Sequence, residues 1–296
     1  YIYWNTIYNS WTVGSDNITI GCGAGEFNQG TLSVALGYQA GQLNQGQQAV
    51  AIGSSAGSQT QYDNAVAIGN AAGQQSQGTA AIAIGNSAAV VSQGQNSIAI
   101  GNSAGQTSQG DATVAIGYQA GQGTQGINAI AIGNTTGGSY QQSGAIAIGL
   151  NAGAFGATAG STQGQGLNAI AMGINAGSTN QGDQTVAIGS NSGQTNQASA
   201  AIAIGFQAGF GTQGTNAIAI GVQAGQLTQG TNAIAIGVSA GNTNQGQTAI
   251  AIGVSAGART QGTNAISIGN LAGNANQGTQ SIAIGNLAGN TNQSQT

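Results

Sequence analysis

The sequence predicts an all-β fold, a parallel β-solenoid of about seventeen coils with sixteen residues in each. Three observations predict it. Glycine recurs every sixteen residues, and aliphatic residues alternate with small ones just before it, which is the period of a strand. A sixteen-residue unit is also too short for a helix pair or a propeller blade, but it fits one turn of a solenoid. We therefore expect each strand to pair with the same strand of the next coil, at about 4.8 Å.

The marker glycine of a coil is the one that ends each segment of the type AIAIG. The marker glycines are Gly21, Gly37, Gly53, Gly69, Gly85, Gly101, Gly117, Gly133, Gly149, Gly173, Gly189, Gly205, Gly221, Gly237, Gly253, Gly269 and Gly285. One step, from Gly149 to Gly173, is eight residues longer than the others. The extra residues fall at 154–161, "AFGATAGS", and we expect a loop there, with contact to a receptor as its functional alternative.

These boundaries give four segments: an aromatic segment at 1–16, solenoid coils at 17–153, the insertion loop at 154–161 and further coils at 162–296. The first segment holds five large aromatic residues, which we expect to cap the first coil or to dock on the last coil of another molecule. They are Tyr1, Tyr3, Trp4, Tyr8 and Trp11. Because the last repeat is an ordinary one, "NLAGNTNQSQT", head-to-tail stacking into a filament is one expected mode of assembly.

The two faces of the strand before each marker glycine differ in size. In one coil, Ile234 and Ile236 share one face, and we expect this face to form the core. The other face carries small residues and is expected to leave a flat apolar strip that another copy covers. Representative residues of this predicted assembly face are Ala217, Ala219, Ala233, Ala235, Ala249 and Ala251. The inverted arrangement, with Ile outward and Ala inward, would strengthen the case for a covered surface.

Glutamine stands eight residues after every marker glycine. The column consists of Gln29, Gln45, Gln61, Gln77, Gln93, Gln109, Gln125, Gln141, Gln165, Gln181, Gln197, Gln213, Gln229, Gln245, Gln261, Gln277 and Gln293. Stacked side-chain amides donate to one neighbour and accept from the other, so the column predicts a structural ladder. Asn precedes the first strand of many coils and is predicted to occupy a turn. Examples are Asn128, Asn168, Asn216, Asn232 and Asn264.

The composition excludes several classes of function. Charged residues make up 2% of the chain, with five acids, one base (Arg259) and no histidine. No general acid and base pair, phosphate loop or metal-ligand cluster can be assembled, so we expect no enzyme, no catalytic residues, no cofactor and no metal. One cation argues against nucleic acid, and the lack of a long apolar run argues against membrane insertion. The single cysteine, Cys22, is expected to be buried.

Several segments resemble a known family of repeats. "NSIAIGNSAG" from Asn96, "QSIAIGNLAG" from Gln280 and the many NAIAIG segments are similar to the head repeats of YadA-like trimeric autotransporter adhesins, and to fibre proteins of phages and large viruses. The resemblance implies a left-handed β-roll, three chains side by side and a role in surface attachment. It also implies that repeat residues contact matrix proteins, namely Asn96, Ser97, Ile98, Ala99, Ile100 and Gly101.

Two functions follow from these observations. The first is a structural or adhesive fibre, extracellular or on the surface of a cell or virion, that associates with itself as a trimer or a head-to-tail filament and contacts a host or matrix surface. The alternative is an ice-binding solenoid, because ice suits flat repetitive faces with few charges. Ordered Thr columns are expected on an ice-binding face, and only scattered Thr stands beside these Ile residues, which favours the fibre.

Overall fold

The computed structural model describes residues 2–5, 10–13, 16–154 and 164–293. The described residues contain strands and turns and no helix, and they form a parallel β-solenoid of about seventeen coils that confirms the predicted fold class. The chain divides into two compact units, Tyr1–Ile132 and Gly133–Thr296, which are described separately. The handedness of the coil stays a prediction.

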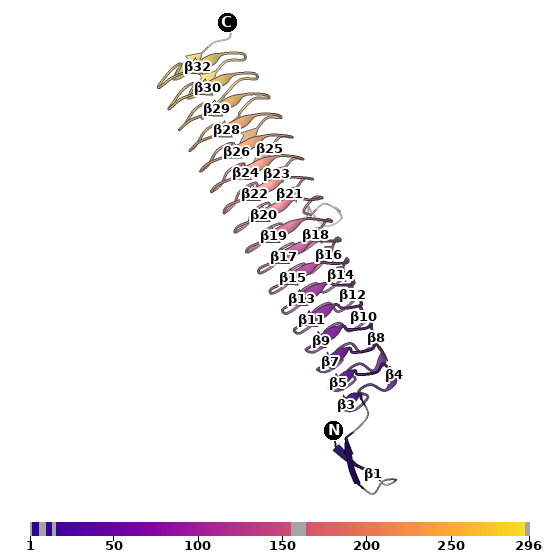
Figure 1. Cartoon of the computed structure of the whole chain (residues 1–296). Coiled ribbons are helices and arrows are strands. Elements are labelled where there is room, and N and C mark those ends of the chain that lie inside the picture. The colour runs from indigo at the N-terminus through magenta and orange to yellow at the C-terminus, as the bar shows by residue number, and fades with distance from the viewer. Residues whose placement is uncertain (1, 6–9, 14–15, 155–163, 294–296) are drawn as a thin grey trace. The chain divides into compact units, whose positions relative to one another are not determined.

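Each coil of unit 1 contributes one short strand to each of two parallel sheets (Figure 1). The isoleucine sheet, made of the strands that precede the marker glycines, consists of β3 (Ile18–Ile20), β5 (Val34–Leu36), β7 (Val50–Ile52), β9 (Val66–Ile68), β11 (Ile82–Ile84), β13 (Ile98–Ile100), β15 (Val114–Ile116) and β17 (Ile130–Ile132). The glutamine sheet consists of β4 (Phe27–Gln29), β6 (Leu43–Gln45), β8 (Thr60–Gln61), β10 (Ser76–Gln77), β12 (Ser92–Gln93), β14 (Ser108–Gln109) and β16 (Thr124–Gln125).

Unit 2 is built in the same way. Its isoleucine sheet consists of β19 (Ile146–Ile148), β20 (Ile170–Met172), β22 (Val186–Ile188), β24 (Ile202–Ile204), β26 (Ile218–Ile220), β28 (Ile234–Ile236), β29 (Ile250–Ile252), β30 (Ile266–Ile268) and β32 (Ile282–Ile284). On the glutamine side lie β18 (Tyr140–Gln141), β21 (Thr179–Gln181), β23 (Thr195–Gln197), β25 (Thr212–Gln213), β27 (Thr228–Gln229), β31 (Ala275–Gln277) and β33 (Thr291–Gln293). Isolated β-bridges at Gln165, Gln245 and Gln261 continue the parallel pairing on the glutamine side in the coils that have no strand there.

Register is the same from coil to coil. Ile218 pairs with Ile234 and Ala219 with Ala235, so every residue meets its own equivalent sixteen positions later. The pairing continues across the insertion, where Ile146 pairs with Ile170. Of the predicted loop 154–161, Ala154 is buried, and residues 155–161 lie outside the described residues.

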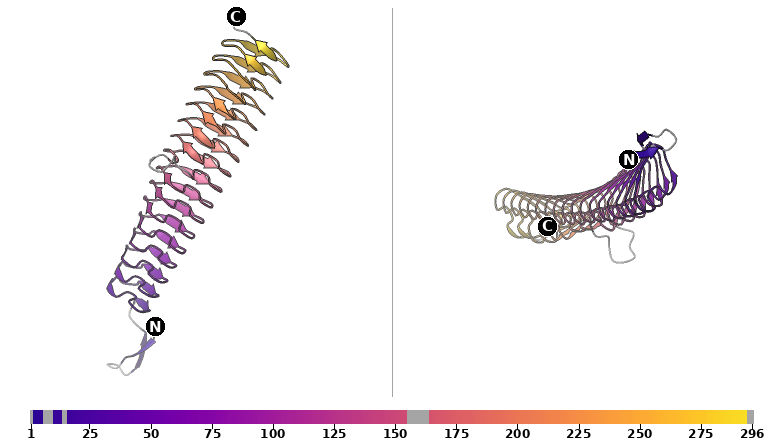
Figure 2. Two further views of the ribbon diagram at one scale, coloured as in Figure 1. Left: turned by 180° about the vertical axis from the view of Figure 1, so that it is seen from behind. Right: turned by 90° about the horizontal axis from the view of Figure 1, so that it is seen from below.

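The core of each unit is made of alanine and glutamine, and this corrects the predicted orientation of the strands. Ala217, Ala219, Ala233, Ala235, Ala249 and Ala251 all have 0% exposure, so the side chains predicted to form an assembly face lie inside the coil. Ile236 is instead 37% exposed. The coil is flattened into two layers (Figure 2), and the glutamine side chains fill the space between them. A Cβ atom added to Gly241 would lie 2.8 Å from Cδ of Gln245, so the glutamine side chain leaves no room for a methyl group at this position.

The N-terminal aromatic segment contains a small sheet of its own. β1 (Ile2–Asn5) pairs antiparallel with β2 (Ser10–Val13), with Trp4 opposite Trp11 and Tyr3 opposite Thr12. Tyr1 and Tyr8 lie outside the described residues. The described part of this segment thus forms a two-stranded sheet, and its role as a cap or docking element stays a prediction.

Candidate functional site

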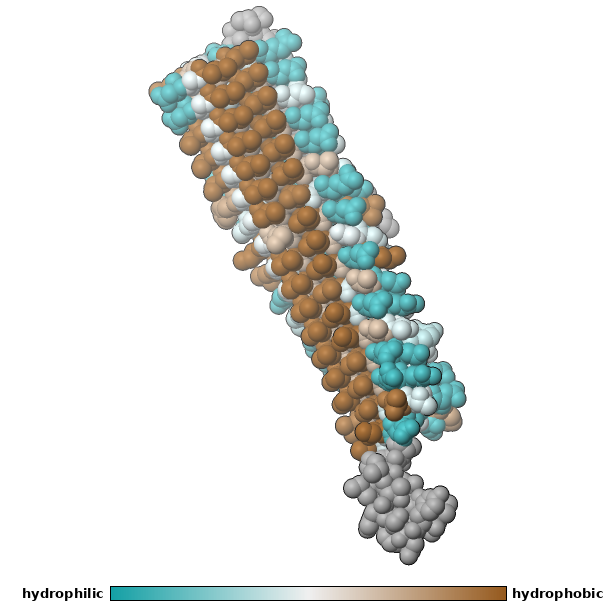
Figure 3. All heavy atoms as spheres, viewed as in Figure 1, coloured by the Kyte–Doolittle hydropathy of each residue, from teal (hydrophilic) through white to brown (hydrophobic). Residues whose placement is uncertain are grey.

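The outer surface of the isoleucine sheet is an apolar face, here called the isoleucine face. It consists of the residues three and one positions before each marker glycine, which alternate with the buried alanines. Stacking covers more than half of most of these side chains, and those near the C-terminal end of unit 2 are more open, with Ile282 61% and Ile284 65% exposed. Figure 3 shows two continuous apolar columns over this sheet in each unit.

The glutamine column forms the predicted ladder inside the coil. Nε2 of Gln229 lies 2.7 Å from the carbonyl oxygen of Ile218 in the isoleucine sheet and 3.1 Å from Oε1 of Gln245 in the next coil. It also approaches the carbonyl oxygen of Ala233 at 3.3 Å. Gln229 therefore joins the two layers of its coil and also joins one coil to the next. The buried amide has these partners, as burial of a polar group requires.

The ladder is made of runs rather than one unbroken series. Within the described residues, the Oε1 atoms of Gln93, Gln109, Gln181 and Gln213 have no hydrogen-bond partner. At one place a hydroxyl group replaces the direct contact. Ser267 stands where most other coils carry Ala; it accepts from Nε2 of Gln261 at 3.3 Å and donates to Oε1 of Gln277 at 2.5 Å. The Ser267 hydroxyl group thus bridges Gln261 and Gln277 and continues the ladder between their two coils.

The turns account for the remaining repeated residues. Gly237 has a φ of +128°, and a Cβ atom there would lie 2.6 Å from the carbonyl oxygen of Gly253. The marker glycine is thus required both by its backbone conformation and by the close stacking of the coils. The turn prediction for asparagine is confirmed, since Asn128, Asn168, Asn216, Asn232 and Asn264 all have φ between 52° and 59°.

Three of the five acids share a contact with the backbone that the sequence did not indicate. Asp63, Asp111 and Asp183 occupy the same position of their coils, six residues before the marker glycine. Each accepts a hydrogen bond from a backbone N–H of the preceding coil, at 2.8 to 2.9 Å. Asp63 and Asp111 stand three coils apart in unit 1, about 14 Å at strand spacing, beyond the screening length of physiological salt.

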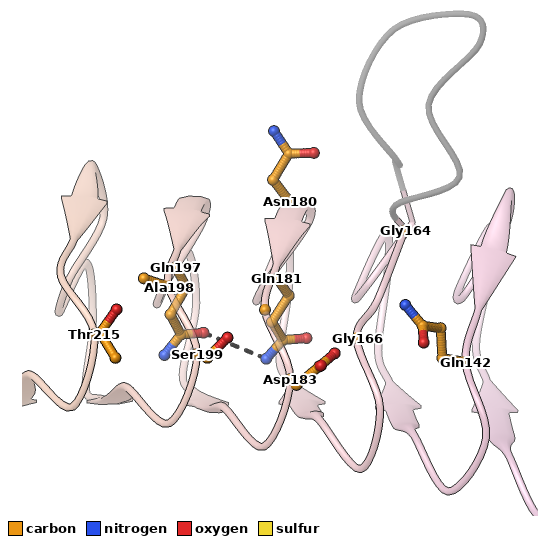
Figure 4. Close-up of a pocket in the computed structure, with 11 residues that line it drawn as sticks. Gln142, Gly164, Gly166, Asn180, Gln181, Asp183, Gln197, Ala198, Ser199 and Thr215 are labelled. Carbon is orange, nitrogen blue, oxygen red and sulfur yellow. Dashed lines mark hydrogen bonds between the residues drawn. The ribbon is translucent and has the colours of Figure 1, made fainter.

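Unit 2 has a shallow polar hollow of about 380 Å³ near Asp183, on the glutamine side. Gln142, Asn180, Gln181, Asp183, Gln197 and Ser199 contribute polar side chains to its lining. These groups do not converge, because Asn180 points away from Gln181 and Asp183 (Figure 4). The Oδ1 atom of Asp183 already accepts the N–H of Leu167. The hollow therefore lacks an arrangement of acid, base or nucleophile that catalysis would require.

The structure also shows the position of the cysteine and the grouping of possible metal ligands. Cys22 is exposed, which corrects the expectation that it is buried, because it stands in the outward turn just after marker glycine Gly21. Within the described ranges, no group of three or more His, Cys, Asp or Glu side chains is placed to hold a metal ion. The same residues include no helix with the length and apolar character needed to cross a bilayer.

Comparison with known families identifies the repeat. Residues 92–120 and 165–192, one segment in each unit, match the YadA head domain repeat. The chain therefore carries YadA-like head repeats, as the motifs from Asn96 predicted. No curated protein matches the chain. The repeats and the β-solenoid together fit a structural fibre of the adhesin type, a class without enzymatic activity.

Proposed function

We propose that the protein is a structural and adhesive segment of a surface fibre, extracellular or on a virion, in which several copies associate through the isoleucine face. The observation that carries the proposal is the continuous pair of Ile and Val columns on one surface of each unit. Soluble monomers rarely leave a contiguous apolar surface of this size uncovered.

The apolar character of the isoleucine face supports a second copy of the chain as the partner that covers it. The columns contain no charged or hydrogen-bonding side chains, apart from the thioether of Met172. A partner must therefore match a flat, evenly spaced apolar surface, and another copy with the same coil spacing does so along its whole length. The resemblance to heads of trimeric adhesins supports three copies side by side; the head-to-tail filament is the other mode.

Ice binding is not favoured. The flat repetitive face carries Ile and Val instead of the ordered Thr columns expected of an ice-binding surface. Contact of Asn96–Gly101 with a matrix protein is compatible with the fibre role, although Ser97 and Ala99 are fully buried and cannot take part directly.

Sedimentation equilibrium of the purified protein tests the proposal, together with electron microscopy of the same sample. We expect oligomers that dissociate in a variant with Ile220→Thr, Ile236→Thr and Ile252→Thr, which keeps β-branched side chains while making one column polar. Monomeric rods for the unsubstituted protein would contradict self-association, and a clear thermal hysteresis would favour ice binding instead.

A further inference from the structure

The apolar surface of unit 2 is wider than that of unit 1. The additional column is the residue directly after the marker glycine, here called the flanking column. In unit 2 its apolar part runs from Leu150 to Val254, through Leu150, Ile174, Ser190, Phe206, Val222, Val238 and Val254, and Asn stands at the two ends of the column, at Asn134, Asn270 and Asn286. Apart from Ser190, the side chains of the apolar part are 43% to 51% exposed. Figure 3 shows this column beside the isoleucine face, separated from it by the pale column of glycines.

In unit 1 the same position is largely polar. Its central residues are Ser54, Asn70, Asn86 and Asn102, all exposed, and Cys22, Tyr38 and Tyr118 occupy the remaining places. The backbone around the position is the same in both units, since the carbonyl of Val222 accepts from the N–H of Ser239 at 2.8 Å and that of Asn70 from the N–H of Ser87 at 2.9 Å. The fold thus accepts either Asn or Val there, and coil formation does not explain why unit 2 carries apolar residues.

We infer that the flanking column of unit 2 is part of the surface on which copies associate, and that unit 2 of one copy packs on unit 2 of another. The inference rests on the proposed self-association. Beyond self-association, it names the residues that widen the contact surface and the unit of the second copy that they contact. A unit 2 partner covers the Leu150–Val254 part of the flanking column with equally apolar side chains, whereas the 54–102 part of unit 1 would place Asn and Ser against it.

The area available is in the range of a stable contact. Full burial of an aliphatic side chain removes roughly 60 to 120 Å² of apolar surface from water, so about two dozen partly exposed side chains offer on the order of 500 to 1,000 Å². These are the two columns of the isoleucine face and the flanking column of unit 2. A stable protein interface takes about 800 Å² from each partner. The face also has no charges that would need pairing, so a second copy meets no desolvated ion.

Three valine-to-asparagine changes in the full chain test this inference: Val222→Asn, Val238→Asn and Val254→Asn. Asparagine is the residue that unit 1 carries at this position, so the coil should form. The matched control is Thr212→Asn, Thr228→Asn and Thr260→Asn on the glutamine side, where Asn244 and Asn276 show that asparagine is accepted. Sedimentation equilibrium gives the dissociation constant of each, and circular dichroism confirms the β fold.

We expect the valine variant to raise the dissociation constant at least fivefold and the threonine variant to leave it within twofold. A smaller rise for the valine variant, with the unsubstituted protein still associating, would overturn the inference and leave the proposed function intact. A monomeric unsubstituted protein would overturn both.

If the valine variant does not fold, the reciprocal change decides the question. Asn70→Val, Asn86→Val and Asn102→Val give unit 1 the same wide apolar surface and should tighten association at least fivefold. Unchanged association in that variant would overturn the inference.

Discussion

Nε2 of Gln229 lies 3.1 Å from Oε1 of Gln245, one coil further along the solenoid, and both side chains are almost completely buried. The same amide nitrogen lies 2.7 Å from the carbonyl of Ile218 in the opposite layer. One side chain therefore contributes to the interior of its own coil and to the stacking of two coils. The interior has few other side chains larger than methyl, so the consequences of changing it can be predicted.

Replacing Gln229 by Ala should destabilise unit 2 strongly. The change removes a buried amide that fills the space between the two layers and leaves Oε1 and carbonyl partners without their donor. We expect a loss of about 2–4 kcal/mol in the free energy of unfolding, measured by urea denaturation. Thr228→Ala is the control, because Thr228 is the exposed neighbour on the same strand. Equal effects of the two changes would contradict the ladder.

Replacing Ala235 by Val tests which face of the strand is inside. Ala235 is fully buried, so two added methyl groups should cost about 1–3 kcal/mol through overpacking. Ile236→Val, on the neighbouring outward position, should cost less than about 1 kcal/mol in the monomer. Urea midpoints of the two variants compare them directly. A tolerated valine at 235 and a damaging one at 236 would indicate that isoleucine faces inward after all.

Replacing Gly237 by Ala should destabilise the fold. Its φ of +128° is unfavourable for any residue with a side chain, and the new Cβ atom would lie 2.6 Å from the carbonyl oxygen of Gly253. Gly285→Ala is a matched control, because it has a similar φ of +124° but its nearest neighbour would be the Ala288 side chain at 3.9 Å. Thermal melting should show a clearly larger loss for Gly237→Ala, and similar losses would mean that stacking distance does not matter.

Trypsin should cleave the folded protein slowly and the unfolded protein once. The chain has a single Lys or Arg residue, Arg259. Its backbone N–H donates to the carbonyl of Asn274 in the next coil at 3.0 Å, so the segment must leave the stack before it can enter a protease site. Mass spectrometry should find two fragments after denaturation and the intact chain before it. Rapid cleavage under native conditions would show that this coil opens readily.

The sequence predicted the coil, its period and the glutamine ladder, because each depends only on which positions repeat. It did not predict which strand face is inside. Alternation separates Ala235 from Ile236 equally well in either orientation, and the usual preference for burying large aliphatic residues favoured the wrong one. The distance between the two layers determines which face lies inside. That distance depends on contacts between the layers, such as the one from Gln229 to Ile218.

Two other features of the candidate site could not be predicted from the sequence, because they depend on contacts between coils. The contact between Asp111 and the N–H of Gln95 joins two coils through a turn, and neither residue is repeated in every coil. The role of Ser267 depends on its lying between two glutamines of successive coils. The wider apolar surface of unit 2, in contrast, is visible in the sequence once the outward positions are known, since Val222, Val238 and Val254 stand one coil apart.

The constant register has a consequence for how such a chain can vary in length. Ile218 pairs with Ile234, and Ile234 pairs with Ile250, with the same partners on every strand. Deleting residues 234–249 would bring Ile250 against Ile218 and reproduce the original pairs, so recombination between repeats can lengthen or shorten unit 2 by whole coils. Stability in repeat arrays depends on nearest neighbours, so such changes keep every remaining interface unchanged. The length of the solenoid can thus change through whole-coil insertions and deletions while its fold stays the same.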